Sequence, residues 1–296
     1  MSNVKCKVCL SDSVEEIFDS FNTHGKNILD DGDKFQVYRC NHCGLVFLND
    51  IEVNQSYYDK YYQDDYYKED KTGVSFVNLV SSALSRFSIN KKQKLILKML
   101  DKKIGRVSIL DIGCGTGDFL ENLNVSRFDR YGCEINEKGY SACIGKGLKV
   151  YKGDVFNIDF KNKKFYVVTL WHVLEHVKDP VKLFERVDKV LYEDGILVFQ
   201  VPNTNSLGFK VGGKYWFHMD SPRHLVLYNK KSVEELCRAS GFEVVSIVNE
   251  FYDYPLDLFW SVRKSNLRYV IYPFYIIFKL FSKEHLTFIC RKKQSI

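Results

Sequence analysis

The feature that most constrains the fold is an alternation of short apolar runs and helical patterns that begins at Val107. Five runs, VSILDIG, DRYGCEIN, LKVYKGD, KFYVVTLWH and GILVFQVPN, end in turn-forming or polar residues, and helical segments such as DPVKLFERVDKVL lie between them. Strands that alternate with helices pair in parallel through right-handed crossovers, and helices then cover both faces of an open sheet. The sequence therefore predicts an α/β fold whose ligands bind beyond the carboxyl ends of the strands.

The first apolar run leads into a glycine-rich loop, and the spacing of its glycines limits the ligand. Gly113, Gly115 and Gly117 follow one another at intervals of two residues. A dinucleotide-binding fingerprint needs a third glycine where this chain has Asp118, and no Gly-Lys-Ser/Thr follows as in a Walker motif. Asp111 precedes the loop and Asp118 follows it, so their charges favour a ligand with an ammonium and a sulfonium group over a pyrophosphate.

Two more carboxylates end the next two strands of the pattern. Glu134, in GCEIN, lies where a carboxylate can accept hydrogen bonds from both hydroxyls of a ribose. Asp154, in KGDVF, is placed to accept a hydrogen bond from an adenine amino group. One carboxylate after each of three successive strands is hard to explain by packing, so we predict a positively charged cofactor that carries adenosine.

Four of the nine cysteines form two close pairs near the N-terminus, Cys6 with Cys9 and Cys40 with Cys43. Each pair places two thiolates on a tight turn, and together they supply the tetrahedral sulfur set of a closed, structural zinc site. The pairs are further apart than in the usual ribbon, so a longer hairpin or loop must connect them. We therefore predict a zinc-binding module over residues 1–50 that holds a structural Zn²⁺.

The charge of this module argues against a nucleic-acid partner. Residues 1–50 carry five Lys or Arg against eight Asp or Glu, a balance that would repel a phosphate backbone. The N-terminal stretch MSNVKCKVCLSDSVEE reaches polar and acidic residues before an apolar core forms, unlike a signal peptide. We therefore expect a cytoplasmic protein without a nucleic-acid partner.

Residues 51–104 are predicted to form a helical lid or linker. An amphipathic helix is expected over residues 88–103, and the stretch SYYDKYYQDDYYKED before it contains three tyrosine pairs. The rings of these pairs either pack against the main domain or belong to a lid, from which Tyr62, Tyr66 or Tyr67 reaches a substrate.

The motif LDIGCGTG and the pattern around it, over roughly residues 88–293, resemble class I S-adenosylmethionine-dependent methyltransferases. The resemblance implies a Rossmann-like, seven-stranded, mostly parallel sheet within residues 105–296, closed by an antiparallel hairpin of FEVVSIVNE and HLTFICRKK. It also implies S-adenosyl-L-methionine as the cofactor, with the loop glycines near its methionine part and Glu134 near its ribose. Asp154 and Val155 would contact the adenine, and we interpret Trp171 as a wall of the cofactor or acceptor cavity.

Three stretches resemble particular subgroups of these enzymes. WHVLEHVKDP is similar to ubiquinone-pathway-type methyltransferases, and the stretch from VPNTN to RASGFE is similar to methyltransferases found with bacterial surface-polysaccharide genes. The cysteine pairs resemble the zinc module of deoxysugar C-methyltransferases from antibiotic pathways. We predict methyl transfer to a hydroxyl of a small molecule, with a sugar or glycolipid precursor favoured. The alternatives are a nucleotide-sugar C-methyltransferase, a quinone-type O-methyltransferase at the membrane and a non-enzymatic, zinc-bearing binding protein.

Transfer to a hydroxyl requires a group that removes its proton, and a histidine near neutral pKa suits this task. His172 and His176 stand four residues apart at the expected start of the helix after the fourth strand, so that they would share one helix face. Glu175 is expected to orient one of them. The alternative is that one histidine caps the helix or packs beneath it.

A second group of candidate residues lies in the long connection after the fifth strand, where loops cover the acceptor site. His218, Arg223 and His224 are the candidate substrate contacts, because the planar fork of Arg223 suits a phosphate or carboxylate. The alternative is that DSPRHL forms a structural turn locked by a proline and internal hydrogen bonds.

An apolar insertion is expected at about residues 251–283, where NLRYVIYPFYIIFKLFSK is too short to span a bilayer. This segment either packs against the domain, lines a cavity for a lipid-linked acceptor, or lies in the membrane interface with Arg268, Lys279 and Lys283 toward acidic lipid. Residues 268–283 are thus the candidate peripheral membrane contact.

Overall fold

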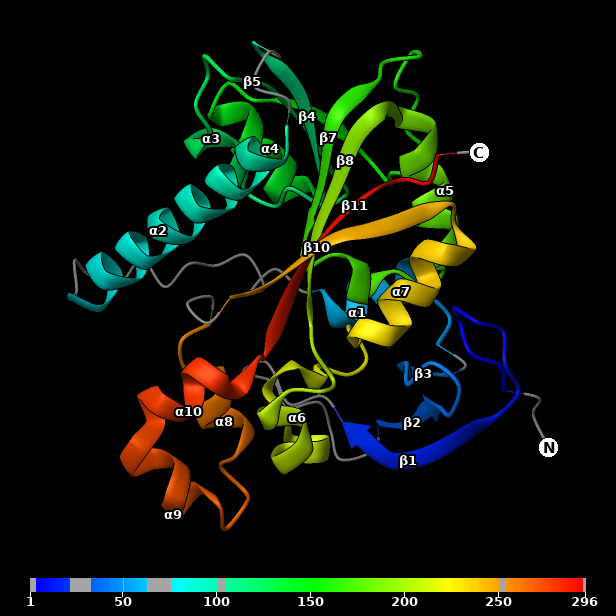
Figure 1. Ribbon diagram of the computed structural model, residues 1–296, viewed down its shortest axis with the longest axis vertical. Helices are drawn as coiled ribbons and strands as arrows, with labels where there is room; N and C mark the ends of the chain where they lie inside the picture. The colour runs from blue at the N-terminus through cyan, green and yellow to red at the C-terminus, as the bar shows by residue number, and fades with distance from the viewer. Residues whose placement is uncertain are drawn as a thin grey trace.

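The computed structural model describes residues 4–21, 33–49, 51–62, 76–100, 105–250 and 254–294. Two sheets organise them (Figure 1). The larger sheet has seven strands in the order β10-β11-β8-β7-β4-β5-β6. Their bounds are β4 (Val107–Ile112), β5 (Phe128–Glu134), β6 (Lys149–Lys152), β7 (Phe165–Trp171), β8 (Leu191–Pro202), β10 (Phe242–Glu250) and β11 (His285–Lys292).

The pairing within the large sheet confirms the predicted α/β fold. Strands β6, β5, β4, β7 and β8 run parallel, whereas β11 pairs antiparallel with both β8 and β10. Each strand expected from an apolar run is present, including the closing hairpin of β10 and β11. Side chains alternate between the faces of β4, where Ile109 packs on one face and Leu110 on the other, because successive residues of a strand point to opposite sides.

Helices cover both faces of this sheet (Figure 1). Buried residues of α2 (Phe76–Met99), α3 (Asp118–Asn122) and α4 (Glu137–Gly145) share one hydrophobic cluster. Those of α5 (Pro180–Val190) and α7 (Lys230–Ala239) share another on the opposite face. Helix α2 begins twelve residues before the expected Ser88, and residues 101–104 at its expected end lie outside the described ranges.

The smaller sheet is antiparallel and has the order β1-β2-β3-β9. Strands β1 (Val14–Phe21), β2 (Lys34–Cys40) and β3 (Val46–Leu48) come from the predicted zinc module, and helix α1 (Gln55–Tyr61) follows them. Strand β9 (Val226–Leu227) comes from the connection after β8 and pairs with β3. The module therefore takes its fourth strand from the main domain.

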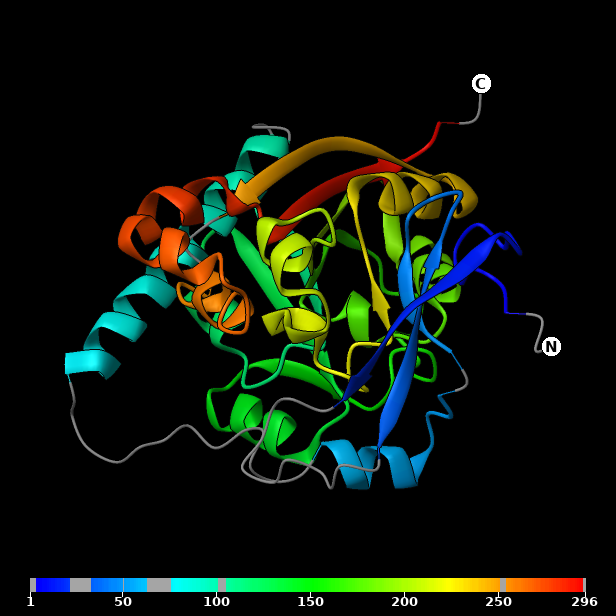
Figure 2. The same cartoon turned by 90° about the horizontal axis from the view of Figure 1, so that it is seen from below.

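Short helices lie near the carboxyl ends of the parallel strands, on the side of the small sheet (Figures 1 and 2). They are α6 (Leu207–Gly212), α8 (Asp257–Ser261), α9 (Arg268–Ile271) and α10 (Tyr275–Ser282). Helices α8 to α10 lie within the predicted apolar insertion. Among the helices of the described ranges, none combines the length and the apolar character that crossing a bilayer needs.

Candidate active site

The glycine loop between β4 and α3 has the conformation that its sequence predicts. Gly113, Gly115 and Gly117 have φ angles of +66°, +55° and +79°, in the left-handed region that favours glycine. A Cβ atom at Gly113 would lie 2.7 Å from the side chain of Val173, and one at Gly117 would lie 2.5 Å from that of Leu148. The loop therefore packs closely against the segment after β7, and side chains there would block this approach.

Glu134, at the end of β5, holds the loop. One carboxylate oxygen accepts a hydrogen bond from the backbone N–H of Gly115 at 2.8 Å, and the other accepts one from Asn136 at 2.8 Å. The side chain is 4% exposed, and this burial raises its pKa. Because each carboxylate oxygen can accept a second hydrogen bond, the residue remains able to bind both hydroxyls of a ribose.

Asp111 lies beneath the loop. Its carboxylate accepts a hydrogen bond from Thr169 Oγ1 at 2.7 Å and is 2% exposed. Burial raises its pKa to about 7, although the bond from Thr169 and the charge of Lys92 act in the opposite direction. The residue therefore links the end of β4 to β7, and its direct contact with the cofactor stays a prediction.

The second acidic residue that flanks the loop has a different role. Asp118 forms an ion pair with Lys146 and accepts a hydrogen bond from Thr116 at 3.1 Å. Its charge is therefore offset by a neighbouring cation. The expectation that both flanking carboxylates attract a cationic ligand is thus weakened at Asp118. The sequence did not show this, because Lys146 is distant in sequence and only folding brings it to Asp118.

The predicted adenine-binding residues follow β6. Asp154 accepts a hydrogen bond from the backbone N–H of Phe156 at 3.0 Å, which fixes the turn. The carbonyl of Val155 accepts one from Arg186 Nε at 3.0 Å, and its side chain is buried. Both residues lie at the carboxyl end of the sheet with the glycine loop, and their adenine contacts stay a prediction.

Trp171 ends β7 beside the strand that leads into the loop. Its ring packs edge-on against Phe119 with 5.1 Å between the centroids, and Lys92 Nζ lies 4.4 Å from its centroid. Within the described residues, its buried indole N–H has no hydrogen-bond acceptor. Its position supports the interpretation of a cavity wall, and Lys92 is a neighbour that the sequence did not single out.

The candidate catalytic histidines do not share a helix face, which corrects the expectation from their spacing. The segment after β7 forms the 3₁₀ helix η2 (Leu174–His176), and α5 begins only at Pro180. Asp179 accepts a hydrogen bond from the backbone N–H of Lys182 and so caps α5 at this later point. His172 and His176 therefore point into two different clusters.

His172 is oriented by Glu175, as predicted. Its Nδ1 lies 3.2 Å from Glu175 Oε1, and its ring contacts the rings of Tyr254 and His285. Burial by itself raises the pKa of Glu175, but the bond from His172 and the nearby imidazoles outweigh it and lower the pKa to about 2. An ionised carboxylate only accepts hydrogen bonds, so the His172 nitrogen that faces it, Nδ1, carries a proton.

The other nitrogen of His172 is buried, and among the described residues it has no hydrogen-bond partner. The backbone of His172 has a φ of +54°, which non-glycine residues adopt rarely and which is frequent at functional sites. The role of His172 as the base that removes a proton stays a prediction.

His176 belongs to a second cluster. Its Nδ1 lies 3.0 Å from Tyr62 Oη and 3.0 Å from the backbone carbonyl of Arg223, and its ring packs against His224. Burial and the neighbouring His224 lower its pKa to about 4. Of the tyrosines weighed for a lid, Tyr62 thus reaches the site, whereas Tyr66 and Tyr67 lie outside the described residues.

The DSPRHL segment is a turn closed by internal contacts. Arg223 donates from Nε to both carboxylate oxygens of Asp220, at 3.1 and 3.0 Å. His224 Nδ1 lies 2.7 Å from the carbonyl of His218. This geometry agrees with the alternative of a structural turn, and an anionic substrate at Arg223 would have to displace Asp220.

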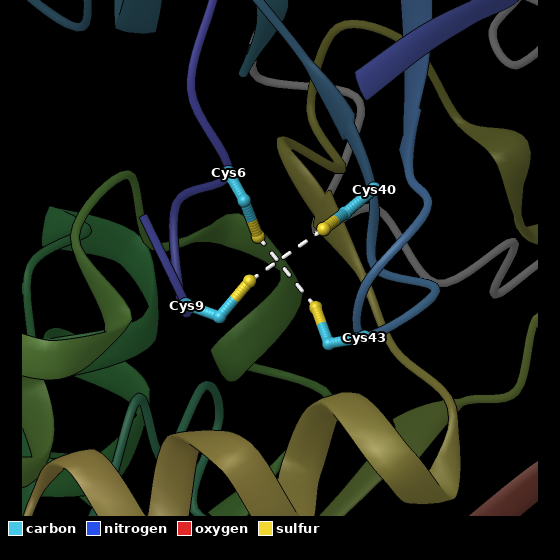
Figure 3. Close-up of side chains that lie close together, drawn as sticks. All are labelled: Cys6, Cys9, Cys40 and Cys43. Atoms are coloured by element: carbon cyan, nitrogen blue, oxygen red, sulfur yellow. Dashed lines mark hydrogen bonds between the residues drawn. The ribbon is translucent and has the colours of Figure 1, made fainter. Parts of the chain in front are cut away.

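The four N-terminal cysteines converge (Figure 3). The Sγ atoms of Cys6 and Cys43 lie 3.6 Å apart, and those of Cys9 and Cys40 lie 3.5 Å apart. Zinc–sulfur bonds of about 2.3 Å in a tetrahedron place sulfurs about 3.8 Å apart, so the arrangement fits Zn²⁺.

The two cysteine turns have matching backbones. The N–H of Cys6 donates to Ser11 and that of Cys40 donates to Leu45, both at 2.9 Å. The residue after each pair, Leu10 in one turn and Gly44 in the other, has a positive φ. This repetition supports two equivalent knuckles around one ion.

The fold and the site together define a cofactor-binding α/β enzyme with a glycine loop, a ribose-type carboxylate and a buried histidine. Residues 84–247, more than half of the chain, match the family model of the methyltransferase domain, and the chain belongs to this family. It is an S-adenosylmethionine-dependent methyltransferase.

Individual relatives are distant. The chain is 23% identical to a ubiquinone biosynthesis O-methyltransferase of Azoarcus sp. over 182 residues, which cover 55% of this chain and 76% of that protein. It is 29% identical to an uncharacterised protein of Methanocaldococcus jannaschii over 184 residues, covering 54% and 70%. The structure resembles magnesium protoporphyrin IX methyltransferase of Synechocystis with bound S-adenosylhomocysteine, with a TM-score of 0.52 and 14% identity over 81% of this chain and 97% of that one. This likeness shows the fold alone.

Proposed function

We propose that this enzyme methylates a hydroxyl group of a small molecule, with a sugar or glycolipid precursor as the favoured acceptor. The observation that carries the proposal is the buried Nε2 of His172, which has no hydrogen-bond partner in the part of the chain that the structure describes, and whose other nitrogen is held by ionised Glu175. This histidine directly follows Trp171 and lies on the segment that touches the glycine loop.

The residues support proton removal during transfer. When bound, S-adenosylmethionine supplies an electrophilic methyl group on a sulfonium. With that donor bound, His172 Nε2 would take the proton of the acceptor hydroxyl, whose oxygen would then bear the methyl group in its place. Glu175 stabilises the imidazolium that results.

The test is transfer of a labelled methyl group to three probes: a nucleoside-diphosphate sugar, a polyprenyl-phosphate-linked sugar and a demethylated quinol. Both His172→Ala and Glu175→Gln should lower kcat about 100-fold or more, with S-adenosylhomocysteine affinity unchanged within about twofold. His42→Ala, at an exposed position, is the control. Unchanged turnover in both variants would refute the assignment of the base.

A quinone-type acceptor is the second candidate, since the ubiquinone O-methyltransferase of Azoarcus sp. is a relative. Methylation of the quinol probe alone would select it. A carbon-bound methyl group in the product, seen by NMR, would instead select the nucleotide-sugar C-methyltransferase alternative.

We also propose that the four cysteines hold a structural Zn²⁺. The sulfur distances and the matched turns support this, and four thiolate ligands leave no position for a catalytic water.

A lipid-linked acceptor fits the surface of the insertion. Eleven of the nineteen exposed large apolar side chains among the described residues lie between Tyr254 and Phe281. The cations Lys264 and Lys283 are exposed beside them, whereas Lys279 is buried against Asp257, contrary to the expected orientation. We propose that this surface lies on acidic lipid.

Co-sedimentation with phosphatidylglycerol vesicles tests this contact. Ile276→Glu combined with Phe281→Glu, at positions 76% and 74% exposed, should abolish sedimentation. Val125→Glu, at an exposed position outside the insertion, should not. Equal sedimentation of all three proteins would refute the membrane contact.

A further inference from the structure

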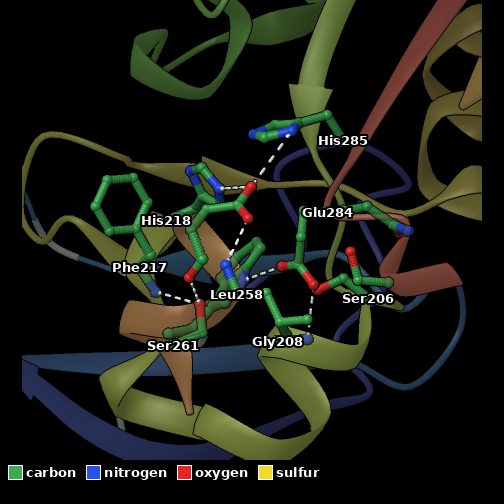
Figure 4. Close-up of polar contacts among 12 residues, drawn as sticks. Ser206, Gly208, Phe217, His218, Leu258, Ser261, Glu284 and His285 are labelled. Carbon is green, nitrogen blue, oxygen red and sulfur yellow. Dashed lines mark hydrogen bonds and ion pairs between the residues drawn. The ribbon is translucent and has the colours of Figure 1, made fainter. Parts of the chain in front are cut away.

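We propose that His218, Asp257 and His285 bind a divalent transition-metal ion at a second site, separate from the four cysteines. The three residues come from distant parts of the sequence: the 3₁₀ helix η4 (Phe217–Met219), the first residue of α8 and the first residue of β11. Figure 4 shows the rings of His218 and His285 turned toward the same polar cluster.

The distances suit a common ligand. His218 Nε2 lies 3.3 Å from Asp257 Oδ2, and His285 Nδ1 lies 3.8 Å from the same oxygen. The three donor atoms lie within 4.8 Å of one another. Metal–ligand bonds of about 2.1 Å place donor atoms about 3.0–3.5 Å apart, so small shifts close the site around an ion.

His285 gives the independent reason to expect a ligand. Its side chain is 0% exposed, and neither ring nitrogen has a hydrogen-bond partner among the described residues. Buried polar groups without partners are rare because burial removes their bonds to water. A bound ion would satisfy one of these nitrogens.

The Asp257 carboxylate is held in place by neighbouring donors. Lys279 Nζ and the backbone N–H of Leu258 both bind Asp257 Oδ1 at 2.5 Å, which fixes the carboxylate and leaves Oδ2 toward the histidines. Glu284, the neighbour of His285 in sequence, adds a second buried carboxyl group. Two imidazoles and one carboxylate form a donor set that suits Zn²⁺, Fe²⁺ or Co²⁺.

A second triad, Glu175 with His176 and His224, also has close donor atoms. There, however, each histidine has its Nδ1 within hydrogen-bond distance of a backbone carbonyl, at Arg223 and at His218. Moreover, among the described residues no buried ring nitrogen of that triad lacks a hydrogen-bond partner, whereas both ring nitrogens of His285 do.

Three protein ligands leave coordination positions open. The ring of His172 packs 5.0 Å from that of His285, so an ion at this site would lie beside the group assigned to proton removal. The proposal rests on the proposed function only for this neighbourhood, and the metal site itself is tested independently of it.

The experiment measures metal content after incubation with Zn²⁺ and desalting, in the full chain. His285→Phe and Asp257→Asn should each lose about one equivalent relative to the unaltered protein, whereas Thr287→Val, buried two residues further along β11, should lose none. Co²⁺ bound to His218, Asp257 and His285 should show visible d–d absorption. It should not show the thiolate-to-cobalt charge-transfer band that Co²⁺ at the four cysteines would give.

The midpoint of thermal unfolding (Tm) distinguishes a site that binds a metal ion from one that holds only water or nothing. If no ion binds, His285→Phe removes two unsatisfied nitrogens and should raise the Tm with metal content unchanged, and that result would overturn the proposal. If an ion binds, added Zn²⁺ should raise the Tm of the unaltered protein more than that of the variant. S-adenosylhomocysteine binding should be equal in both, so loss of metal is distinguishable from failure of the methyltransferase site.

Discussion

At the scale of single residues, a carboxylate of the site both positions the backbone and keeps the capacity to accept hydrogen bonds from a ligand. Glu134 positions the glycine loop through Gly115 while it keeps acceptor capacity for a ribose. Asp111 and Glu175 are both deeply buried, but their pKa values move in opposite directions. Only Glu175 has enough neighbouring imidazole groups to outweigh the cost of burial.

Glu134→Ala should weaken S-adenosylhomocysteine binding about 10- to 100-fold, because it removes the ribose acceptor and releases the loop. Asp118→Asn flanks the same loop but is paired with Lys146, so it should change affinity less than about threefold. Titration calorimetry measures both. Equal losses in the two variants would contradict the assignment of Glu134.

The buried imidazole of His176 predicts a pH dependence of stability. Its pKa falls from 6.5 to about 4 on folding, so protons bind the unfolded chain first as the pH decreases. Its contribution to stability is therefore complete above pH 6.5 and is lost progressively as the pH falls to about 4.

Urea unfolding at several pH values checks this dependence. His176→Phe should flatten the decrease between pH 6.5 and about 4, whereas His42→Ala, on the surface, should leave it unchanged. A variant with the same slope as the unaltered protein would exclude His176 as the source.

At the scale of elements, one helix start connects the cysteine turn to the main domain. Asn229 caps α7 by accepting from the N–H of Ser232 at 2.9 Å, and its amide donates to the carbonyl of Gly44 at 2.7 Å. The same turn leads into β3, which pairs with β9 just before the cap. The helix cap and the cysteine turn therefore depend on one side chain.

Asn229→Ala should lower the free energy of unfolding by about 1–3 kcal/mol, since it removes the cap and leaves the Gly44 carbonyl without this donor. Zinc release to a chromogenic chelator should also become faster. Glu234→Ala, on the exposed face of α7, is the matched control and should change neither quantity. A loss of stability without faster zinc release would show that Asn229 stabilises the helix cap but not the cysteine turn.

At the scale of the whole molecule, the small sheet and the large sheet share a core. Buried residues Cys40 and Phe47 belong to the same hydrophobic cluster as Leu110 of β4 and Leu236 of α7. The fourth strand of the small sheet, β9, comes from the main domain. On its own, the segment 1–50 would therefore lack this strand and part of its packing. The division into separate domains stays a prediction, which metal removal can test.

Removal of zinc with a strong chelator at neutral pH should lower the Tm of the entire chain in one cooperative transition, because both sheets contribute to one core. Calorimetry of the unaltered protein with and without chelator measures this. Two transitions, of which only one responds to the chelator, would instead support an independent module.

The sequence alone determined what depends on neighbouring residues and on periodicity. It predicted five strands, the glycine loop, the cysteine turns and the place of Glu134, because these follow from local backbone preferences and from the rule that parallel strands end at one edge. The last two strands were implied only by the resemblance to class I methyltransferases. His285 has such a signal too, because it is the first residue of the expected last strand, which runs antiparallel and begins at that edge.

The tertiary structure decided what depends on contacts between distant segments. A spacing of four between His172 and His176 suggested a shared face, but η2 and the later start of α5 turn them apart. Lys146 reaches Asp118, β9 joins the small sheet, and Asp257 and His285 meet His218 only through the fold. Such contacts balance burial, charge and chain entropy over the whole molecule, and no local pattern encodes that balance.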